Sequence, residues 1–158
     1  GCEGLEVMFM DMADIDGDGL EDAIVTEYTN QKIVYMKRLD HNGLKWKEYP
    51  IDIPEITGRA KAVKAGDIDG DGNLDLVHTT NTLGDNKKSG IFWLSYRDSP
   101  SNPIWDWYDV SGSEGTKFDR VELLDLDGDG DLDILTCEEN YGTNSQGLGI
   151  IWYENPLY

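Results

Sequence analysis

The sequence predicts an all-β protein built from repeated units, and three observations carry this prediction. The apolar stretches are short and rich in Val, Ile, Tyr, Trp and Phe, which favour strands. No stretch keeps the 3.6-residue apolar period of an amphipathic helix. An Asp-Gly-rich segment recurs three times, beginning at Asp14, Asp67 and Asp125, with a period of about 50–60 residues.

Each repeat extends beyond its Asp-Gly-rich segment. Two apolar segments follow every copy at matching places, and a fourth segment, which contains Trp, appears at 46–51 and again at 105–110. Four short strands per unit at this period favour the blades of a β-propeller over a sandwich, which would not need such regular repetition. The expected blades, within a single propeller segment spanning 1–158, are about 5–52, 59–111 and 117–158.

Charge and composition exclude several classes of function. The chain has 32 Asp and Glu against 13 Lys and Arg, a formal net charge of −19. This charge repels phosphate backbones and anionic membrane surfaces, so we expect no nucleic-acid partner. No apolar run approaches the roughly 18 residues of a membrane span. With 39% hydrophobic residues, the chain can still form a packed core.

The Asp-Gly-rich segments have the chemistry of calcium loops. Calcium takes six to eight oxygen ligands, mostly from carboxylates and carbonyls. Each segment offers Asp at positions 1, 3, 5 and 9 and a backbone carbonyl at position 7, with glycines that permit a tight turn. The predicted ligands of three Ca²⁺ ions are Asp14, Asp16, Asp18, Leu20 and Asp22; Asp67, Asp69, Asp71, Asn73 and Asp75; and Asp125, Asp127, Asp129, Asp131 and Asp133.

Three alternatives compete with this interpretation. An EF-hand needs Glu at position 12 and flanking helices, whereas Val25, His78 and Thr136 stand there and strand formers follow. Catalytic carboxylates are conceivable, but three near-identical copies favour a repeated structural role. A solvated turn without an ion would leave four carboxylates of each loop repelling one another.

The Asp-x-Asp-Gly-Asp-Gly-x-x-Asp loop followed by a strand resembles the FG-GAP/VCBS repeats of integrin α-subunit heads and of many secreted bacterial proteins. The Gly-Ile-Ile-Trp-Tyr-Glu-Asn-Pro segment at 149–156 is also similar to these repeats. The resemblance implies calcium loops and a propeller of about seven blades. The third unit ends at Tyr158 before a fourth strand, so we expect further blades from other sequence, another chain or self-association.

The predicted function is a calcium-stabilised propeller module that binds a glycan or protein ligand through loops opposite the calcium loops. Loops of this kind need abundant calcium, which predicts an extracellular, cell-surface or periplasmic setting. The alternative is the propeller part of a polysaccharide lyase or another carbohydrate-active enzyme, in which basic residues near the central channel would neutralise a uronate. The ligand-binding candidates are Arg59, Lys61, Trp107, Arg120 and Tyr141.

Other conspicuous side chains are assigned to packing. His78, in a strand, is expected to pack and not to catalyse. The repeated aromatics are expected to pack blade against blade and not to stack on sugars; they are Tyr35, Trp93 and Trp152. Whether the two cysteines, Cys2 and Cys137, form a disulfide is left open.

Overall fold

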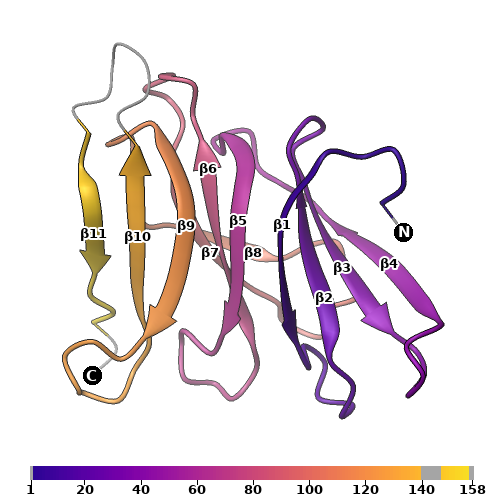
Figure 1. Ribbon diagram of the computed structural model, residues 1–158. Helices are drawn as coiled ribbons and strands as arrows, with labels where there is room; N and C mark the ends of the chain where they lie inside the picture. Colours follow the sequence, from indigo (N-terminus) through magenta and orange to yellow (C-terminus); the bar gives the residue numbers. More distant parts are fainter. Residues whose placement is uncertain (1, 140–146, 157–158) are drawn as a thin grey trace.

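The computed structural model describes residues 2–139 and 147–156, and in this part of the chain every regular element is a strand (Figure 1). The prediction of an all-β protein is confirmed. No helix that could span a membrane occurs among these residues. The strands are β1 (Val7–Ala13), β2 (Asp22–Glu27), β3 (Lys32–Arg38), β4 (Trp46–Ile51), β5 (Arg59–Gly66), β6 (Asp75–Asn81), β7 (Ile91–Ser95), β8 (Asp106–Asp109), β9 (Lys117–Leu124), β10 (Asp133–Glu139) and β11 (Gly149–Tyr153).

The strands form three propeller-like blades. Strands β1 to β4 make the first blade, an antiparallel sheet in chain order. Strands β5 to β8 make the second in the same way, and β9 to β11 make the third, with β10 in the middle. A single residue pair, Asn81 with Lys117, joins β6 to β9, so the second and third blades form one curled sheet.

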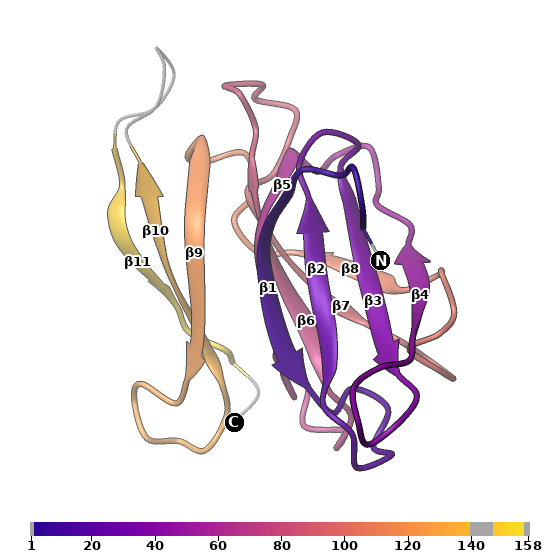
Figure 2. The same cartoon turned by 45° about the vertical axis from the view of Figure 1, so that its right-hand side comes forward.

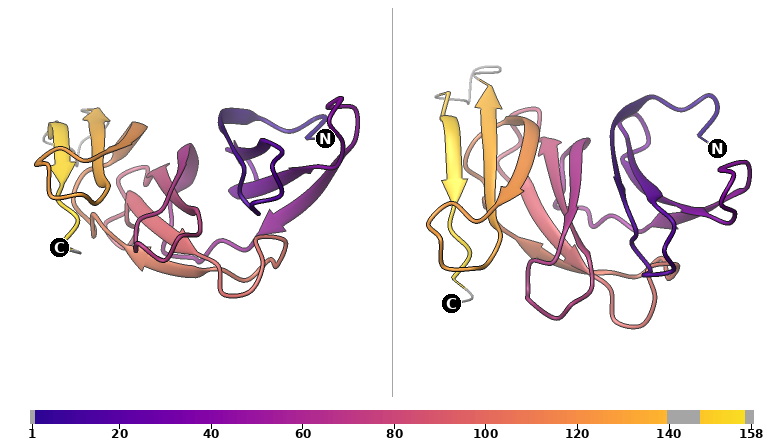
Figure 3. Two further views of the ribbon diagram at one scale, coloured as in Figure 1. Left: turned by 90° about the horizontal axis from the view of Figure 1, so that it is seen from below. Right: turned by 60° about the horizontal axis from the view of Figure 1, so that its bottom comes forward.

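The blades stand in an open arc. Seen from below, they radiate from its concave side, where the first strands β1, β5 and β9 lie next to one another (Figure 3). Figure 2 shows the third blade at one end of the molecule and the first at the other. The Asp-Gly-rich loops, which join the first two strands of each blade, all emerge at the bottom of Figure 1, and in the first two blades the loops between the second and third strands emerge at the top.

The residue pairing in the three blades is equivalent. In each blade the second and third strands align so that the residue two places after the buried Asp at position 9 lies opposite an aromatic residue. Paired residues share one face of a sheet because side chains alternate along a strand. The equivalent pairs are Ile24 with Tyr35, Val77 with Trp93, and Leu135 with Trp152.

These pairs define the face of a blade that meets the next blade, here called the forward face; the opposite face is the backward face. Tyr35 on the forward face of the first blade is fully buried and packs in one cluster with Leu76 and Leu94 of the second. Trp93, on the forward face of the second blade, packs against the cluster that contains Ile134 of the third. The packing role predicted for Tyr35 and Trp93 is confirmed.

Neither cysteine is in a disulfide. Both thiols are half-buried; Cys2 lies in the segment before β1, and Cys137 lies in β10. The open question about their pairing is therefore answered for the structure as described.

His78 is a core residue, as predicted. Its ring is fully buried, Nδ1 lies 3.1 Å from the carbonyl oxygen of Ala62, and the ring meets Trp107 edge to face. Because burial disfavours the charged imidazolium, the pKa of His78 falls from 6.5 to about 4. The folded protein therefore holds this ring neutral at pH values where the unfolded chain protonates it.

We predict that stability falls as the pH is lowered from about 6.5 towards 4, because the unfolded chain binds a proton there that folded His78 refuses. At pH 5 this costs about 2 kcal/mol relative to pH 7. A His78→Gln variant removes the contribution, while the carboxylates titrate alike in both proteins. Urea denaturation at both pH values checks it; equal pH slopes for the two proteins would contradict the assignment.

Candidate metal centre

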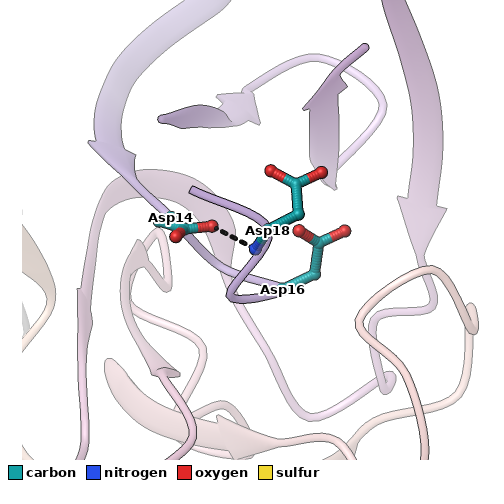
Figure 4. A group of neighbouring side chains, drawn as sticks. All are labelled: Asp14, Asp16 and Asp18. Carbon is teal, nitrogen blue, oxygen red and sulfur yellow. Dashed lines mark hydrogen bonds between the residues drawn. The ribbon is translucent and has the colours of Figure 1, made fainter. Parts of the chain in front are cut away.

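The first Asp-Gly-rich loop brings three carboxylates close together. Figure 4 shows Asp14, Asp16 and Asp18 gathered in the turn between β1 and β2, and a ligand oxygen from each lies within 4.8 Å of the others. Asp14 accepts hydrogen bonds from the backbone N–H of Asp18, at 3.0 Å, and of Gly19, at 2.9 Å. Gly19 has a φ of 87°, which explains why glycine stands at this turn.

The second and third loops repeat this arrangement. Their first Asp accepts from the backbone of the turn, through the N–H of Gly72 in the second loop and of Gly128 in the third. The N–H groups of the predicted carbonyl ligands also donate within the turns: those of Leu20, Asn73 and Asp131 each donate to the Asp two residues earlier. The two further carboxylate groups, each within 4.8 Å, are Asp67, Asp69 and Asp71, and Asp125, Asp127 and Asp129.

The Asp at position 9 lies outside these groups and is buried in all three blades. Asp22 accepts from the Tyr35 hydroxyl at 2.9 Å and from the Arg38 N–H at 2.7 Å, which ties the loop to β3. Asp75 accepts from the Ile68 N–H at 2.9 Å, and burial raises its pKa to about 6. Asp133 accepts from the N–H groups of Leu126 and Asn155. These carboxylates close the loops; their predicted role as metal ligands is not tested by this geometry.

The donor set fits a calcium ion. All the gathered side chains are carboxylates, the ligands that Ca²⁺ prefers, and neither His nor Cys belongs to any of these groups. Asp16 and Asp67 each keep one buried oxygen, Oδ1, without a hydrogen bond from the described residues. A buried carboxylate oxygen without a partner is costly, and a cation would satisfy it. Among the described residues, a basic side chain pairs with these groups in the first loop alone, where Lys37 pairs with Asp16 and, at 2.9 Å, with Asp18.

Each of the basic ligand-binding candidates contacts another side chain of the protein. Lys61 is nearly buried and its Nζ lies 2.6 Å from Asp119, which places an ion pair between β5 and β9. Arg120 pairs with Glu122 at 2.5 Å. The guanidinium of Arg59 lies 5.2 Å from the ring centre of Tyr28.

Of the two aromatic ligand-binding candidates, the structure describes Trp107 but not Tyr141. Trp107 is half-buried, with its ring 5.6 Å from Phe92 and 6.1 Å from His78, so it packs at the edge of the core instead of standing free. Tyr141 lies outside the described residues. A ligand contact by either remains a prediction.

Two buried glutamates at the opposite end of the blades were missed by the sequence reasoning. Glu27 and Glu138 occupy equivalent positions at the end of the second strand of their blades. Glu27 accepts from the N–H groups of Thr29, at 3.0 Å, and Asn30, at 2.6 Å. Glu138 accepts from the N–H groups of Thr116, at 2.8 Å, and of Leu148, at 2.8 Å, the residue directly before β11. The signal was a Glu at the same distance after two of the three Asp-Gly-rich loops.

Fold and loops together define a propeller-like repeat protein with acidic loops at one end of its blades. Residues 14–78, which run from the first such loop to the middle of β6, match the family model described as an FG-GAP-like repeat. This segment of the chain is therefore similar to an FG-GAP repeat, which supports the resemblance that the motif indicated. No curated protein and no solved structure was found to match the chain.

We predict that Glu27→Ala lowers the free energy of unfolding by about 1–3 kcal/mol, because it removes a buried carboxylate that accepts charge-assisted hydrogen bonds from the backbone of the following loop. Glu21→Ala, at an exposed position, is the matched control and should cost less than 0.5 kcal/mol. Chemical denaturation of both variants measures the difference. Equal midpoints would mean that Glu27 does not support the loop after β2.

Proposed function

We propose that the chain is a calcium-stabilised propeller-like module of an extracellular, cell-surface or periplasmic protein, and that its loops opposite the acidic loops bind a glycan or protein ligand. The observation that carries the calcium part is the threefold convergence of carboxylates within 4.8 Å in equivalent turns. Unbound, each group concentrates like charges in a turn whose backbone is already fixed by its glycines. A divalent ion would offset that repulsion and tie the first two strands of each blade together.

The opposite end of the blades supports the ligand part of the proposal. Loops on a rigid scaffold are the usual place for recognition. The loop after β6 is held by the isolated bridge from Ser89 to Thr57 and by the Lys88 ammonium, which donates to the Thr57 carbonyl at 2.8 Å. Residues Asn30, Gln31, Glu55 and Lys88 line a polar hollow between the first and second blades at this end. Amide, carboxylate and ammonium groups together suit the hydroxyl groups of a sugar.

The two end faces of the arc support assembly with further blades of the same repeat type. The forward face of the third blade exposes Ile150 by 81% and Trp152 by 47%, and their equivalents Ile91 and Trp93 are covered by the third blade. The same kind of surface that the chain uses between its own blades is thus open at its end. The occupant that matches it best is the backward face of another such blade.

The other end of the arc offers that complementary surface. The backward face of the first blade carries an apolar groove lined by Met10, Met12, Met36 and Trp46. Its register equivalents in the second and third blades are the residues that receive the preceding blade; Met36, for instance, corresponds to Leu94 and Tyr153. Large exposed apolar patches mark interaction surfaces, so we infer that blades stack at both ends.

We predict that calcium stabilises the fold. Binding to the folded state alone contributes about 2.7 kcal/mol for each site at a hundredfold excess of free ion over Kd. Chelator should lower the melting temperature, and millimolar calcium should restore it. Asp69→Ala should weaken only the second site and Asp127→Ala only the third, as seen by calorimetric titration. Identical melting curves with calcium and with excess chelator would refute the calcium assignment.

A second prediction concerns the end faces. Sedimentation velocity on the isolated chain should show concentration-dependent association, or the chain should bind an apolar dye, because the end faces are uncovered. Ile150→Asp should reduce either signal, whereas Leu44→Asp, at an equally exposed position in the loop after β3, should not. A monomer of 17.7 kDa that binds no dye would contradict the proposed stacking.

A further inference from the structure

We propose that Lys37 is an internal cation of the first acidic loop and competes there with calcium, so that this loop binds calcium more weakly than the other two. The proposal rests on the calcium sites of the proposed function and adds an order among them. The first site would empty first as calcium falls, while the second and third stay occupied. The three near-identical loops would then differ in function because of one side chain outside the repeated motif.

The position of Lys37 follows from the packing of β3. Tyr35, two residues earlier on the same face, is fully buried, and its hydroxyl donates to Asp22 at 2.9 Å. The Arg38 N–H donates to the same carboxylate at 2.7 Å. These two bonds fix β3 against the loop on either side of Lys37. Its ammonium then pairs with Asp16 and lies 2.9 Å from Asp18.

The pairing is partly sheltered from water. The Lys37 side chain is 22% exposed and that of Asp16 is 15% exposed. A sheltered ion pair is screened less by salt than an exposed one, so an entering ion has to displace it.

The other two blades have no lysine at the position equivalent to Lys37. Pairing between the second and third strands places Met36, Leu94 and Tyr153 at equivalent positions. The next residue is Lys37 in the first blade but Ser95 in the second and Glu154 in the third. Among the described residues, no Lys or Arg forms an ion pair with the carboxylate groups of the second and third loops.

The consequence for calcium is a competition between two cations. The ion would use Asp16 and Asp18, so Lys37 has to leave both carboxylates before they can serve the ion. The free energy of the two lost ion pairs therefore reduces the calcium affinity of the first loop. The two contacts, one to the sheltered Asp16 and one to Asp18, whose side chain is 34% exposed, correspond to a difference of about five- to tenfold in Kd.

The test is calorimetric calcium titration of the full chain in two reciprocal variants. Lys37→Met keeps the length of the side chain and removes its charge; it should tighten the first site about five- to tenfold and leave the other two unchanged. Ser95→Lys should install the same competition in the second blade and weaken that site. A third protein, with Asp16→Asn, should lose the first site, and adding Lys37→Met to it should then change no calcium affinity.

Melting in excess chelator gives a readout that does not depend on calcium affinity. Lys37→Met should melt at a lower temperature than the parent there, and should gain more from calcium, because it has lost its internal cation. If the second and third sites bind calcium but Lys37→Met leaves the first unchanged or weaker, the proposal is overturned and the calcium sites stand. If no site binds calcium in any variant, the proposed function fails, and this inference with it.

Discussion

The convergence of three carboxylates within 4.8 Å, at the turn between the first two strands of every blade, is the constraint on which the rest of the structure depends. The turn decides where the first strand ends and where the buried Asp at position 9 begins the second. Glycines with φ near 70–105° make the turn possible, and backbone N–H groups already satisfy part of each carboxylate. The negative charge of the carboxylates still has to be offset. In the first loop Lys37 offsets part of it, and we propose that calcium offsets it in all three loops.

Stacking of blades supplies the remaining stability. A single blade is only one sheet thick, so each of its faces needs a cover. Inside the chain the cover is the next blade: the buried side chains of the first blade's forward face, Ile24, Ile33 and Tyr35, meet Leu76, Phe92 and Leu94 of the second. Full burial of one such side chain is worth roughly 1.5–3 kcal/mol. At the concave side of the arc, ion pairs such as Lys61 with Asp119 and Lys64 with Asp11 join neighbouring first strands.

Much of this was predictable from local pattern. The repeated motif located all three acidic turns, and the short segments rich in branched and aromatic residues located the strands, because both signals lie within a few residues of chain. Tyr35 and Trp93 were recognised as packing residues from their place in the repeat, and His78 because it is a lone histidine within a strand. The prediction that other loops lie at the end of the blades opposite the acidic loops followed from the alternating direction of consecutive strands.

The remainder depends on contacts between segments distant in sequence. Lys37 reaches Asp16 only because Tyr35 and Arg38 fix β3 against the loop, which no spacing rule reveals. The burial of Asp22 with a hydroxyl partner likewise needs the pairing of β2 with β3. Trp107, predicted as a ligand-binding residue, is partly covered by Phe92 and His78. The ion pairs of Lys61 and Arg120 form across or along the first strands, where sequence showed only isolated basic residues.

The central claim is that the three acidic turns are metal sites and not merely solvated loops. The number of ions bound by each chain tests it most directly, by equilibrium dialysis against calcium followed by elemental analysis of the protein. At saturating calcium the account predicts three ions per chain, against three carboxylate groups of equivalent geometry. A protein that retains no calcium above the level of the dialysis buffer would contradict it.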